Sequence, residues 1–369
     1  MLRRALRARF GLIALAWAAN CRAAPGTTSP DFLRIGVAPR PVAMGEAFTG
    51  MADDVNAIAY NPAGLAFVER QEISVVHNMY LDGVQQDYLA YVLPTYKYGS
   101  AAFGANQLRV APFDSFSAED RPAGTVSAQD LSVSGAYAAR WRSAAFGVAV
   151  KHISSRLAGF TAATNAYDLG ALWRLPNGFS LGVARQNMGS GLVYESASQP
   201  LPSQTRLGGS WKGGFLWPGS SSALSLDGVF ARERKFIGAG AEVWLTPFAA
   251  LRVGYLGSED SDIGFSWGAG FKLPLRRRAS SDPTWKAKVR EDTGPAPELQ
   301  IDYAFARMGD LGLTHRLSIS LRFGRSTAEP AYKADWKEIK VPKRRAESPA
   351  KEISAPERVN EGDFSPSWR

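Results

Sequence analysis

The amino-acid sequence predicts an all-β fold: an antiparallel transmembrane β-barrel of about fourteen strands, with a short N-terminal plug segment. Three observations predict it. Between Gln71 and Phe323, segments of about ten residues alternate large apolar side chains with small or polar ones, and turns separate the segments. The chain begins with the layout of an export leader. Beyond that leader, no apolar run reaches the roughly 18 residues that identify a membrane-spanning helix.

The clearest alternating segment is residues 263–272. Successive side chains of a strand point to opposite faces, so this segment has one large apolar face and one small polar face. A sheet that closes on itself, apolar outside and polar inside, explains the pattern in every segment. The apolar face carries Ile263, Phe265, Trp267, Ala269 and Phe271. The opposite face carries Gly264, Ser266, Gly268, Gly270 and Lys272.

The alternating segments form an even-numbered set of strands, as single-chain bacterial barrels require. Each is bounded by turn residues or by a break in the alternation. We place the strands at residues 71–80, 87–96, 100–109, 130–141, 144–156, 164–174, 179–186, 203–212, 223–232, 235–245, 249–256, 263–272, 298–306 and 314–323.

The same alternation points a set of charged side chains into the barrel. Mixed charges suit a hydrated interior or a hydrogen-bonded plug. A path for fatty acids would instead be lined by large apolar side chains, so these charges disfavour simple passage of a hydrophobic solute unless the plug supplies an apolar pocket. The predicted interior charges are Arg140, Lys151, Asp168, Arg174, Arg206, Asp227, Glu242, Arg252, Asp302, Arg316 and Arg322.

The connections between strands are of two kinds. Outer-membrane barrels have short periplasmic turns and longer outside loops, so we assign the long connections 110–129 and 187–202 to the outside. A third long connection, 273–297, is basic and proline-rich, and its side is left open. We expect that simple alternation does not bring all of the short turns to one side. These turns lie at residues 97–99, 142–143, 175–178 and 246–247.

Residues 1–23 have the layout of a signal peptide: arginines, a short apolar run and small residues near a cleavage position. Cys21 is the only cysteine, and it either leaves with this leader or, in a lipoprotein, carries the lipid. The leader holds five arginines, so the formal net charge of +9 falls to about +4 without it. No basic stripe interleaved with aromatic residues is present, which argues against a nucleic-acid partner.

Two further regions flank the predicted barrel, which spans residues 71–323. Residues 24–70 form the plug segment. Residues 324–369 are rich in charge and proline and poor in large apolar side chains, a composition that predicts a disordered tail on the periplasmic side.

Two blocks of sequence carry a resemblance to a known family. The first contains FLRIG at 32–36, RPVAMGEAF at 40–48, ADD at 52–54 and NPAGLA at 61–66. The second contains DYAF at 302–305, GDLGLTHR at 309–316 and LRFG at 321–324. Over residues 31–324 the chain resembles the PorV/PorQ family of bacterial outer-membrane proteins, which is related more distantly to the FadL fatty-acid transporters.

The resemblance implies a fourteen-stranded barrel whose N-terminal segment folds into the lumen or its periplasmic mouth. PorV-like proteins receive the signal domains of cargo exported by type IX secretion, and FadL-like relatives pass hydrophobic molecules. The basic connection and the charged tail depart from the family pattern. The predicted plug motif consists of Arg40, Met44, Gly45, Asp53, Asp54, Asn61, Pro62 and Gly64.

The first block also has a local physical interpretation as a compact plug. Asp53 or Asp54 can cap a short helix that runs to Tyr60. Pro62 ends that helix, because the residue before a proline is pushed out of helical space, and Gly64 permits a tight turn. The alternative is a surface turn that only leads into the first strand. In the second block, the terminal aromatic Phe323 of the last strand resembles a barrel-assembly signal.

Few residues offer chemistry. The histidines, His77, His152 and His315, show no metal-ligand spacing. His152 and Ser154 would share a strand face, as in some outer-membrane lipid hydrolases, but no acid accompanies them, so a histidine at the membrane interface is favoured. The Gly-Ala-Gly runs at 238–240 and 268–270 lie within strands and would make room for a plug. The acidic run 259–262 is interpreted as a solvated loop tip.

The sequence thus predicts a non-enzymatic protein of the bacterial outer membrane, without cofactor or metal. Its predicted partners are outer-membrane lipid and either secreted cargo proteins or components of a secretion system. The first functional hypothesis is a PorV/PorQ-type component or shuttle for type IX-like protein secretion. The alternative is a FadL-like channel for hydrophobic solutes that is gated by the N-terminal plug.

Overall fold

The computed structural model describes residues 31–80, 83–95, 97–116, 118, 120–194, 197–214, 220–232, 234–258, 264–275, 295–307 and 312–327. The fold below belongs to the first of the two units into which the chain divides, which ends at Ala328. The predicted leader, most of the predicted tail, the acidic run 259–262 and the middle of the basic connection lie outside the described residues.

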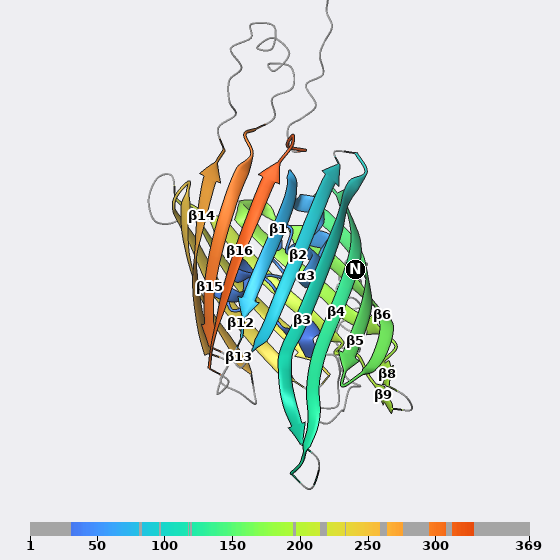
Figure 1. Ribbon diagram of the computed structural model, residues 1–369. Helices are drawn as coiled ribbons and strands as arrows, with labels where there is room; N and C mark the ends of the chain where they lie inside the picture. The colour runs from blue at the N-terminus through green and yellow to red at the C-terminus, as the bar shows by residue number, and fades with distance from the viewer. Residues whose placement is uncertain are drawn as a thin grey trace, which may run out of the picture. The chain divides into compact units, whose positions relative to one another are not determined.

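Within the described residues, fourteen antiparallel strands form one closed barrel, which confirms the predicted fold class (Figure 1). Hydrogen bonds between the first and last strands close it, with Gln71 opposite Phe323 and Met79 opposite His315. The barrel strands are β1 (Gln71–Met79), β2 (Val84–Thr95), β3 (Gly99–Phe116), β4 (Pro122–Trp141), β5 (Ala144–Leu157), β6 (Phe160–Arg174), β7 (Phe179–Gly189), β10 (Gln204–Gly213), β11 (Ser221–Ala231), β12 (Lys235–Thr246), β13 (Ala249–Ser258), β14 (Gly264–Pro274), β15 (Glu298–Arg307) and β16 (Leu313–Phe323).

Alternation along the strands separates an apolar outer face from a polar inner face. In β14 the side chains of Phe265, Trp267 and Phe271 are exposed on the outside, whereas Ser266 is buried inside. The same split recurs in β5 and β6, where valine, leucine and aromatic side chains face outward. The barrel therefore has the surface that a lipid bilayer solvates, with its polar groups on the inside.

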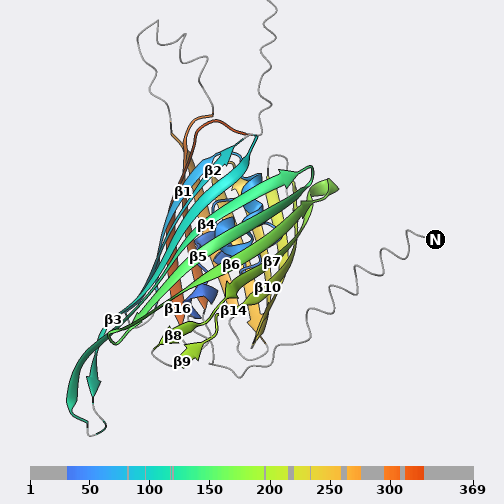
Figure 2. The ribbon, with the colours of Figure 1, turned by 90° about the vertical axis from the view of Figure 1, so that its right-hand side faces the viewer.

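Strands β3 and β4 continue far beyond the rest of the barrel as a two-stranded ribbon (Figure 2). The prediction of a long loop over 110–129 is therefore wrong for most of its length. Phe113 pairs with Val126 and Ser115 with Gly124 in this ribbon. The ribbon has no buried face, so its sequence lacks the alternation from which strands were predicted, and local pairing alone forms it.

The four predicted short turns all lie at one end of the barrel, where β1 begins and β16 ends. The expectation that they would not share a side is wrong, because each one follows an even-numbered barrel strand. We call this end the turn end. The basic connection also leaves and returns there, and the Leu275 amide donates to the Pro297 carbonyl oxygen at 2.8 Å.

The opposite end carries the ribbon and the connection between β7 and β10, and we call it the loop end. That connection, predicted as a loop over 187–202, holds the end of β7 and a small sheet of β8 (Leu192–Tyr194) and β9 (Ala197–Gln199). A turn of 3-10 helix, η3 (Pro176–Gly178), joins β6 to β7 at the turn end.

The N-terminal segment, residues 31–70, lies inside the barrel as short helical turns (Figures 1 and 2). Its large apolar side chains, among them Met44, Phe48, Met51 and Leu65, are almost fully buried and form the core with inward-facing wall residues. The elements are η1 (Asp31–Arg34), α2 (Pro39–Ala43), α3 (Ala57–Tyr60) and η2 (Pro62–Phe67).

No helix in the part of the chain that the structure describes is long and apolar enough to cross a membrane.

Candidate functional site: the lumen segment and its two cavities

Arg40 of α2 is the centre of a buried ion network between the lumen segment and the wall. Its Nε and Nη2 donate to both carboxylate oxygens of Glu242 in β12, at 2.8 and 2.9 Å. Its Nη1 donates to Asp53 at 2.7 Å and to Asp54 at 2.8 Å. Burial works to lower the pKa of Arg40, but these three carboxylates outweigh it and raise that pKa well above its usual value.

The network continues along the inner face of the barrel wall. Arg252 of β13 donates to Glu242 at 2.7 Å and to Asp302 of β15 at 2.7 Å. Buried charges are stable only when they are paired and hydrogen-bonded, and here the wall and the segment compensate one another. Lys212 of β10 adds a second cation to Asp53. Burial would raise the pKa of Asp53, yet Arg40 and Lys212 together lower it far below its usual range.

A second set of wall side chains holds the backbone of the segment. Asp227 of β11 accepts hydrogen bonds from the amides of Phe48 and Thr49, at 3.1 and 2.8 Å. Arg206 of β10 donates to the Thr49 hydroxyl at 3.1 Å and to the Glu46 carbonyl oxygen at 2.6 Å. These charges therefore satisfy backbone groups of a segment that has little regular structure of its own.

Asn61 fastens the middle of the segment to the opposite wall. Its Nδ2 donates to the carbonyl oxygens of Thr49 and Ala171, at 3.0 and 3.1 Å. Its Oδ1 accepts from the Ala63 amide at 3.2 Å and so caps η2. The wall residue that meets Asn61 is Gly170. A Cβ at this position would lie 2.2 Å from the Asn61 Oδ1, so a larger residue would clash.

The remaining motif residues also make close contacts. Gly45 has a φ of +61°, and a Cβ there would lie 2.3 Å from the Tyr255 carbonyl oxygen. The wall glycines Gly238 and Gly240 leave room for Gly45 and Met44. A Cβ on Pro62's wall neighbour, Gly147, would lie 2.3 Å from the Pro62 carbonyl carbon.

Two local expectations for the motif are wrong. Neither Asp53 nor Asp54 caps α3, whose N-cap is Asn56 without a side-chain cap bond. The two carboxylates bind Arg40 instead, because a buried guanidinium is the stronger partner, although Asp54 also accepts from the Asn56 amide at 2.9 Å. Gly64 makes no left-handed turn; it is glycine because a Cβ would lie 2.5 Å from the Ala52 carbonyl oxygen.

The predicted interior charges all occupy inward positions of their strands. Arg140 and Arg174 lie at the turn end, on the ring of Phe67 at 5.1 and 3.9 Å from its centroid. Arg322 pairs with Glu72 at 3.1 Å. The others are buried: Lys151, Asp168, Arg206, Asp227, Glu242, Arg252, Asp302 and Arg316.

Sequence reasoning missed several interior side chains. Glu72, Lys212 and Glu46 make ion pairs in the lumen but were not among the predicted charges. The alternation of β1 and β10 was sufficient to find the first two. Glu46 lies in an irregular stretch, where no periodic signal exists.

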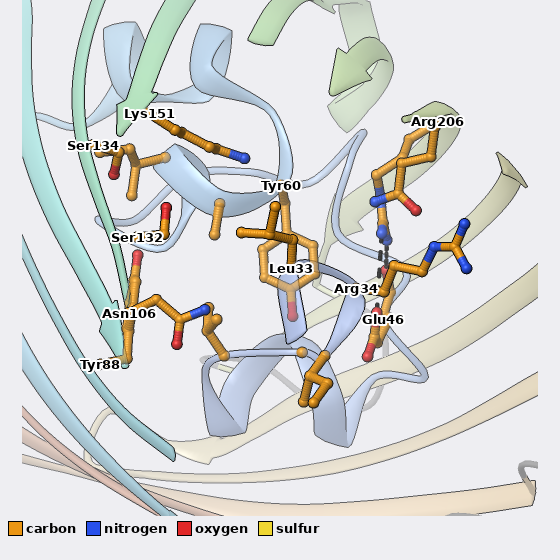
Figure 3. Close-up of a pocket in the computed structure, with 16 residues that line it drawn as sticks. Leu33, Arg34, Glu46, Tyr60, Tyr88, Asn106, Ser132, Ser134, Lys151 and Arg206 are labelled. Carbon is orange, nitrogen blue, oxygen red and sulfur yellow. Dashed lines mark hydrogen bonds and ion pairs between the residues drawn. The ribbon is translucent and has the colours of Figure 1, made fainter. Parts of the chain in front are cut away.

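The loop-end cavity lies between the lumen segment and strands β2 to β5 and β10 (Figure 3). Leu33, Ile35 and Ile58 supply apolar lining, and Tyr60 and Arg206 face the same space. Its volume is about 50 Å³. A cavity of that size holds on the order of a few water molecules, so a larger solute needs the segment to move.

The turn-end cavity lies at the other end of the segment and has a volume of about 400 Å³. The two cavities share no lining residue, and the packed middle of the segment separates them. The lining is mostly polar: Arg40, Asp53, Lys212, Ser222, Glu242, Trp244, Lys272, Gln300 and Arg322.

The histidines lie on the outer face of the barrel. His152 Nδ1 is 2.9 Å from the Asn165 amide oxygen, His77 is 2.8 Å from Asp87, and His315 is 2.7 Å from the Tyr303 hydroxyl. His152 thus meets an amide where a catalytic triad needs a carboxylate. Among the described residues, no group of histidine, cysteine and acidic side chains is arranged to hold a metal ion. Phe323 ends the last strand, and its role in assembly stays a prediction.

Comparison with known proteins places the fold. Residues 24–166 match the model of the Uncharacterised protein family (UPF0164). No curated protein matches the chain. The solved toluene transporter TbuX of Ralstonia pickettii is 13% identical, with a TM-score of 0.52 over 79% of this chain and 98% of that one.

Two further solved structures show the same barrel. The CymD monoaromatic hydrocarbon channel is 11% identical, with a TM-score of 0.50 over 79% of this chain and 97% of that one. A deltaS2 mutant of the TodX monoaromatic hydrocarbon channel is 12% identical, with a TM-score of 0.50 over 78% and 97%. At such identities the likeness is one of fold, and function has to be argued from the lumen.

Proposed function

We propose that this chain is a bacterial outer-membrane channel for small hydrophobic molecules, and that its N-terminal segment closes the lumen. The observation that carries the proposal is the segment itself, which lies inside the barrel and separates the loop-end cavity from the turn-end cavity. The shared fold with a toluene transporter and a monoaromatic hydrocarbon channel supports the choice of solute class.

The charged interior is the main argument against a hydrophobic solute. The lumen segment weakens that argument, because it binds some of these charges and adds apolar side chains. Arg40 and Glu242 are bound in an ion pair, as are Arg252 and Asp302, and Asp227 accepts from a backbone amide of the segment. Leu33, Ile35 and Ile58 of the segment supply the apolar lining of the loop-end cavity. An apolar pocket of this kind is where a hydrophobic solute would first be held.

The end of the segment at the loop end packs apart from the main core. Phe32 packs in a small cluster with Ile153, Ala166 and Leu201, separate from the main core. Displacement of η1 alone would enlarge the loop-end cavity and leave the Arg40 network in place. We therefore expect solute entry to involve residues 31–36.

The test is uptake of toluene by proteoliposomes that contain the full chain. Leu33→Trp fills the loop-end cavity and should abolish uptake, whereas Leu313→Trp, on the exposed outer face, should leave it unchanged. Deletion of residues 31–66 should raise ion conductance. Equal uptake by the parent and Leu33→Trp would show that the cavity is not on the path, and unchanged conductance in the deletion would refute the closure.

The β3–β4 ribbon favours a second candidate function, that of a component or shuttle for protein secretion. Phe113 and Phe116 are 52% and 58% exposed on a ribbon that extends from the loop end. Exposed apolar side chains on such a projection suit a protein partner. The test compares the secreted proteome of a deletion strain, complemented with the full chain or with a chain lacking 110–128. Equal secretion with both would remove this candidate.

A further inference from the structure

We propose that the loop-end cavity selects a small hydrophobic molecule that carries an uncharged oxygen, such as a phenol, over a plain hydrocarbon. This inference rests on the proposed function and narrows its solute class. Three observations carry it: buried donor groups of the lining that lack partners, a lining with one apolar and one polar side, and lining charges that are already paired.

Two tyrosine hydroxyls of the lining have no hydrogen-bond partner in the part of the chain that the structure describes. They belong to Tyr60 of α3 and Tyr88 of β2, which are only 3% and 4% exposed. Buried polar atoms are almost always hydrogen-bonded, so these hydroxyls indicate a partner that enters the cavity. A hydroxyl can donate, so an oxygen atom of a solute fits this role.

Both tyrosine rings are held in place. The Tyr60 ring packs edge-on against Phe48, with centroids 5.6 Å apart, and the guanidinium carbon of Arg206 lies 5.1 Å from its centroid. Tyr88 projects inward from β2, directly opposite Asn106 of β3. The phenol oxygen lies on the axis of its ring, so neither hydroxyl can reach another partner unless the whole ring moves.

The lining has an apolar side and a polar side. Leu33, Ile35 and Ile58 of the lumen segment form the apolar side. A molecule with an apolar body and one oxygen matches both sides, whereas a hydrocarbon that excluded water would leave the hydroxyls without a partner. Figure 3 shows the polar side chains of the barrel wall together on one side of Tyr60: Tyr88, Asn106, Ser132 and Ser134.

The lining contains three cations and one carboxylate, but each cation is paired among the described residues. The carboxylate is that of Glu46, which lies 3.9 Å from Arg206. An organic anion would have to displace one of the paired carboxylates, whereas an uncharged oxygen needs only a hydrogen bond. The pairs are Arg34–Asp31 at 3.4 Å, Lys151–Asp168 at 2.7 Å and Arg206–Asp227 at 3.7 Å.

Arg34 of η1 adds further donors to the lining. Its Nη1 faces Asp31, while its Nε and Nη2 have no hydrogen-bond partner among the described residues. Together with the two tyrosine hydroxyls, these are groups that can donate a hydrogen bond. The solute group that they would meet is therefore an acceptor oxygen. Because η1 is also the element whose displacement would admit a solute, its guanidinium would meet that oxygen at entry.

The experiment is isothermal titration of the purified full chain in neutral detergent, with detergent micelles alone as the blank. The probes are toluene, p-cresol, which adds a hydroxyl to toluene, and p-toluate, which adds a carboxylate. We expect p-cresol to bind most tightly. Tyr88→Phe, which removes one oxygen atom, should weaken p-cresol binding roughly tenfold and should not weaken toluene binding.

The matched control is Tyr91→Phe on the same strand. Tyr91 lies at an outward position of β2, and its hydroxyl donates to Gln71 at 2.7 Å. This substitution removes the same atom outside the cavity and should change the affinity for neither probe. Tyr60→Phe is a second test from the side of the lumen segment, and it should weaken p-cresol binding in the same direction as Tyr88→Phe.

Tighter binding of toluene or p-toluate than of p-cresol would overturn the inference, as would equal p-cresol affinity in the parent, Tyr60→Phe and Tyr88→Phe. Failure of the proposed function has a different signature. Proteoliposomes would then take up neither toluene nor p-cresol, although p-cresol binding still depended on Tyr88. Conversely, toluene uptake that Leu33→Trp abolishes, with p-cresol binding indifferent to both tyrosines, would keep the channel and remove the selectivity for an oxygen.

Discussion

Arg40 and Glu242 form a two-point contact, with hydrogen bonds of 2.8 and 2.9 Å, between the lumen segment and the barrel wall. The two residues are 202 positions apart in the chain. A guanidinium matches a carboxylate at two points, so the contact sets orientation as well as distance. This pair fixes the position of the segment relative to β12. It thereby determines where the segment separates the loop-end cavity from the turn-end cavity.

Replacing Arg40 by alanine should therefore release the segment. Glu242, Asp53 and Asp54 would lose a shared cation, and loss of one partner of a buried ion pair costs on the order of 3–5 kcal/mol. We expect higher ion conductance in planar bilayers and faster proteolysis within residues 31–70. Arg109→Ala, which breaks an exposed pair with Asp87, is the control and should change neither. A closed, protease-resistant Arg40→Ala protein would contradict this role.

The close approach of Asn61 to the wall makes a second prediction. A Cβ on Gly170 would lie 2.2 Å from Asn61 Oδ1, so Gly170→Ala should displace the motif and destabilise the segment by roughly 1–3 kcal/mol. Gly135→Ala is the matched control, because nothing lies within 4 Å of its Cβ position. Ion conductance and the thermal unfolding midpoint are measured for both variants. Equal values for the two would mean that the Asn61 motif tolerates displacement from the wall.

The periodic parts of this fold were predictable, and the reason is the alternation of side chains. Glu242 and Arg252 lie on strands with one polar and one apolar face, so their inward direction follows from the sequence. The identity of the partner of Glu242 does not follow from the sequence, because Arg40 lies in a segment without periodicity. Nor was the ribbon predictable, since Phe113 and Val126 pair where neither face is buried.

The same reasoning explains the errors in the plug motif. Asp53 and Asp54 stand where a helix cap is expected, and local sequence cannot reveal that Arg40 competes for them. Gly64 is a turn residue by local rules, but tertiary contact with Ala52 decides its identity. Tertiary partners thus override local preferences where the chain is irregular.

Burial of Glu46 makes stability depend on pH. Burial raises the pKa of Glu46 above its usual value of 4.5, while Arg206 and Arg316 oppose the shift. The protonated carboxyl is favoured in the folded state, so this contribution is fully present below about pH 4 and is lost as pH rises through the raised pKa. The parent should therefore lose thermal stability relative to Glu46→Gln as pH increases. A difference between the two that stays constant with pH would rule this out.

The outer face of β6 tests the placement of the barrel in a membrane. Leu169 is 51% exposed, faces outward, and lies one residue from the buried Asp168. An arginine at the middle of the bilayer costs about 2–4 kcal/mol on the lipid face of a barrel. Leu169→Arg should therefore lower the free energy of unfolding in lipid vesicles by that amount, as measured by urea titration.

The ribbon supplies the control for this prediction. Phe113 is also exposed, at 52%, but it lies on the part of β3 that extends beyond the rest of the barrel. Phe113→Arg should cost less than about 1 kcal/mol, because its side chain would stay in water or among headgroups. Equal costs for the two substitutions would place the ribbon in the same environment as β6. The expected difference would place the membrane boundary between Phe113 and Leu169, since only the side chain at position 169 would lie in hydrocarbon.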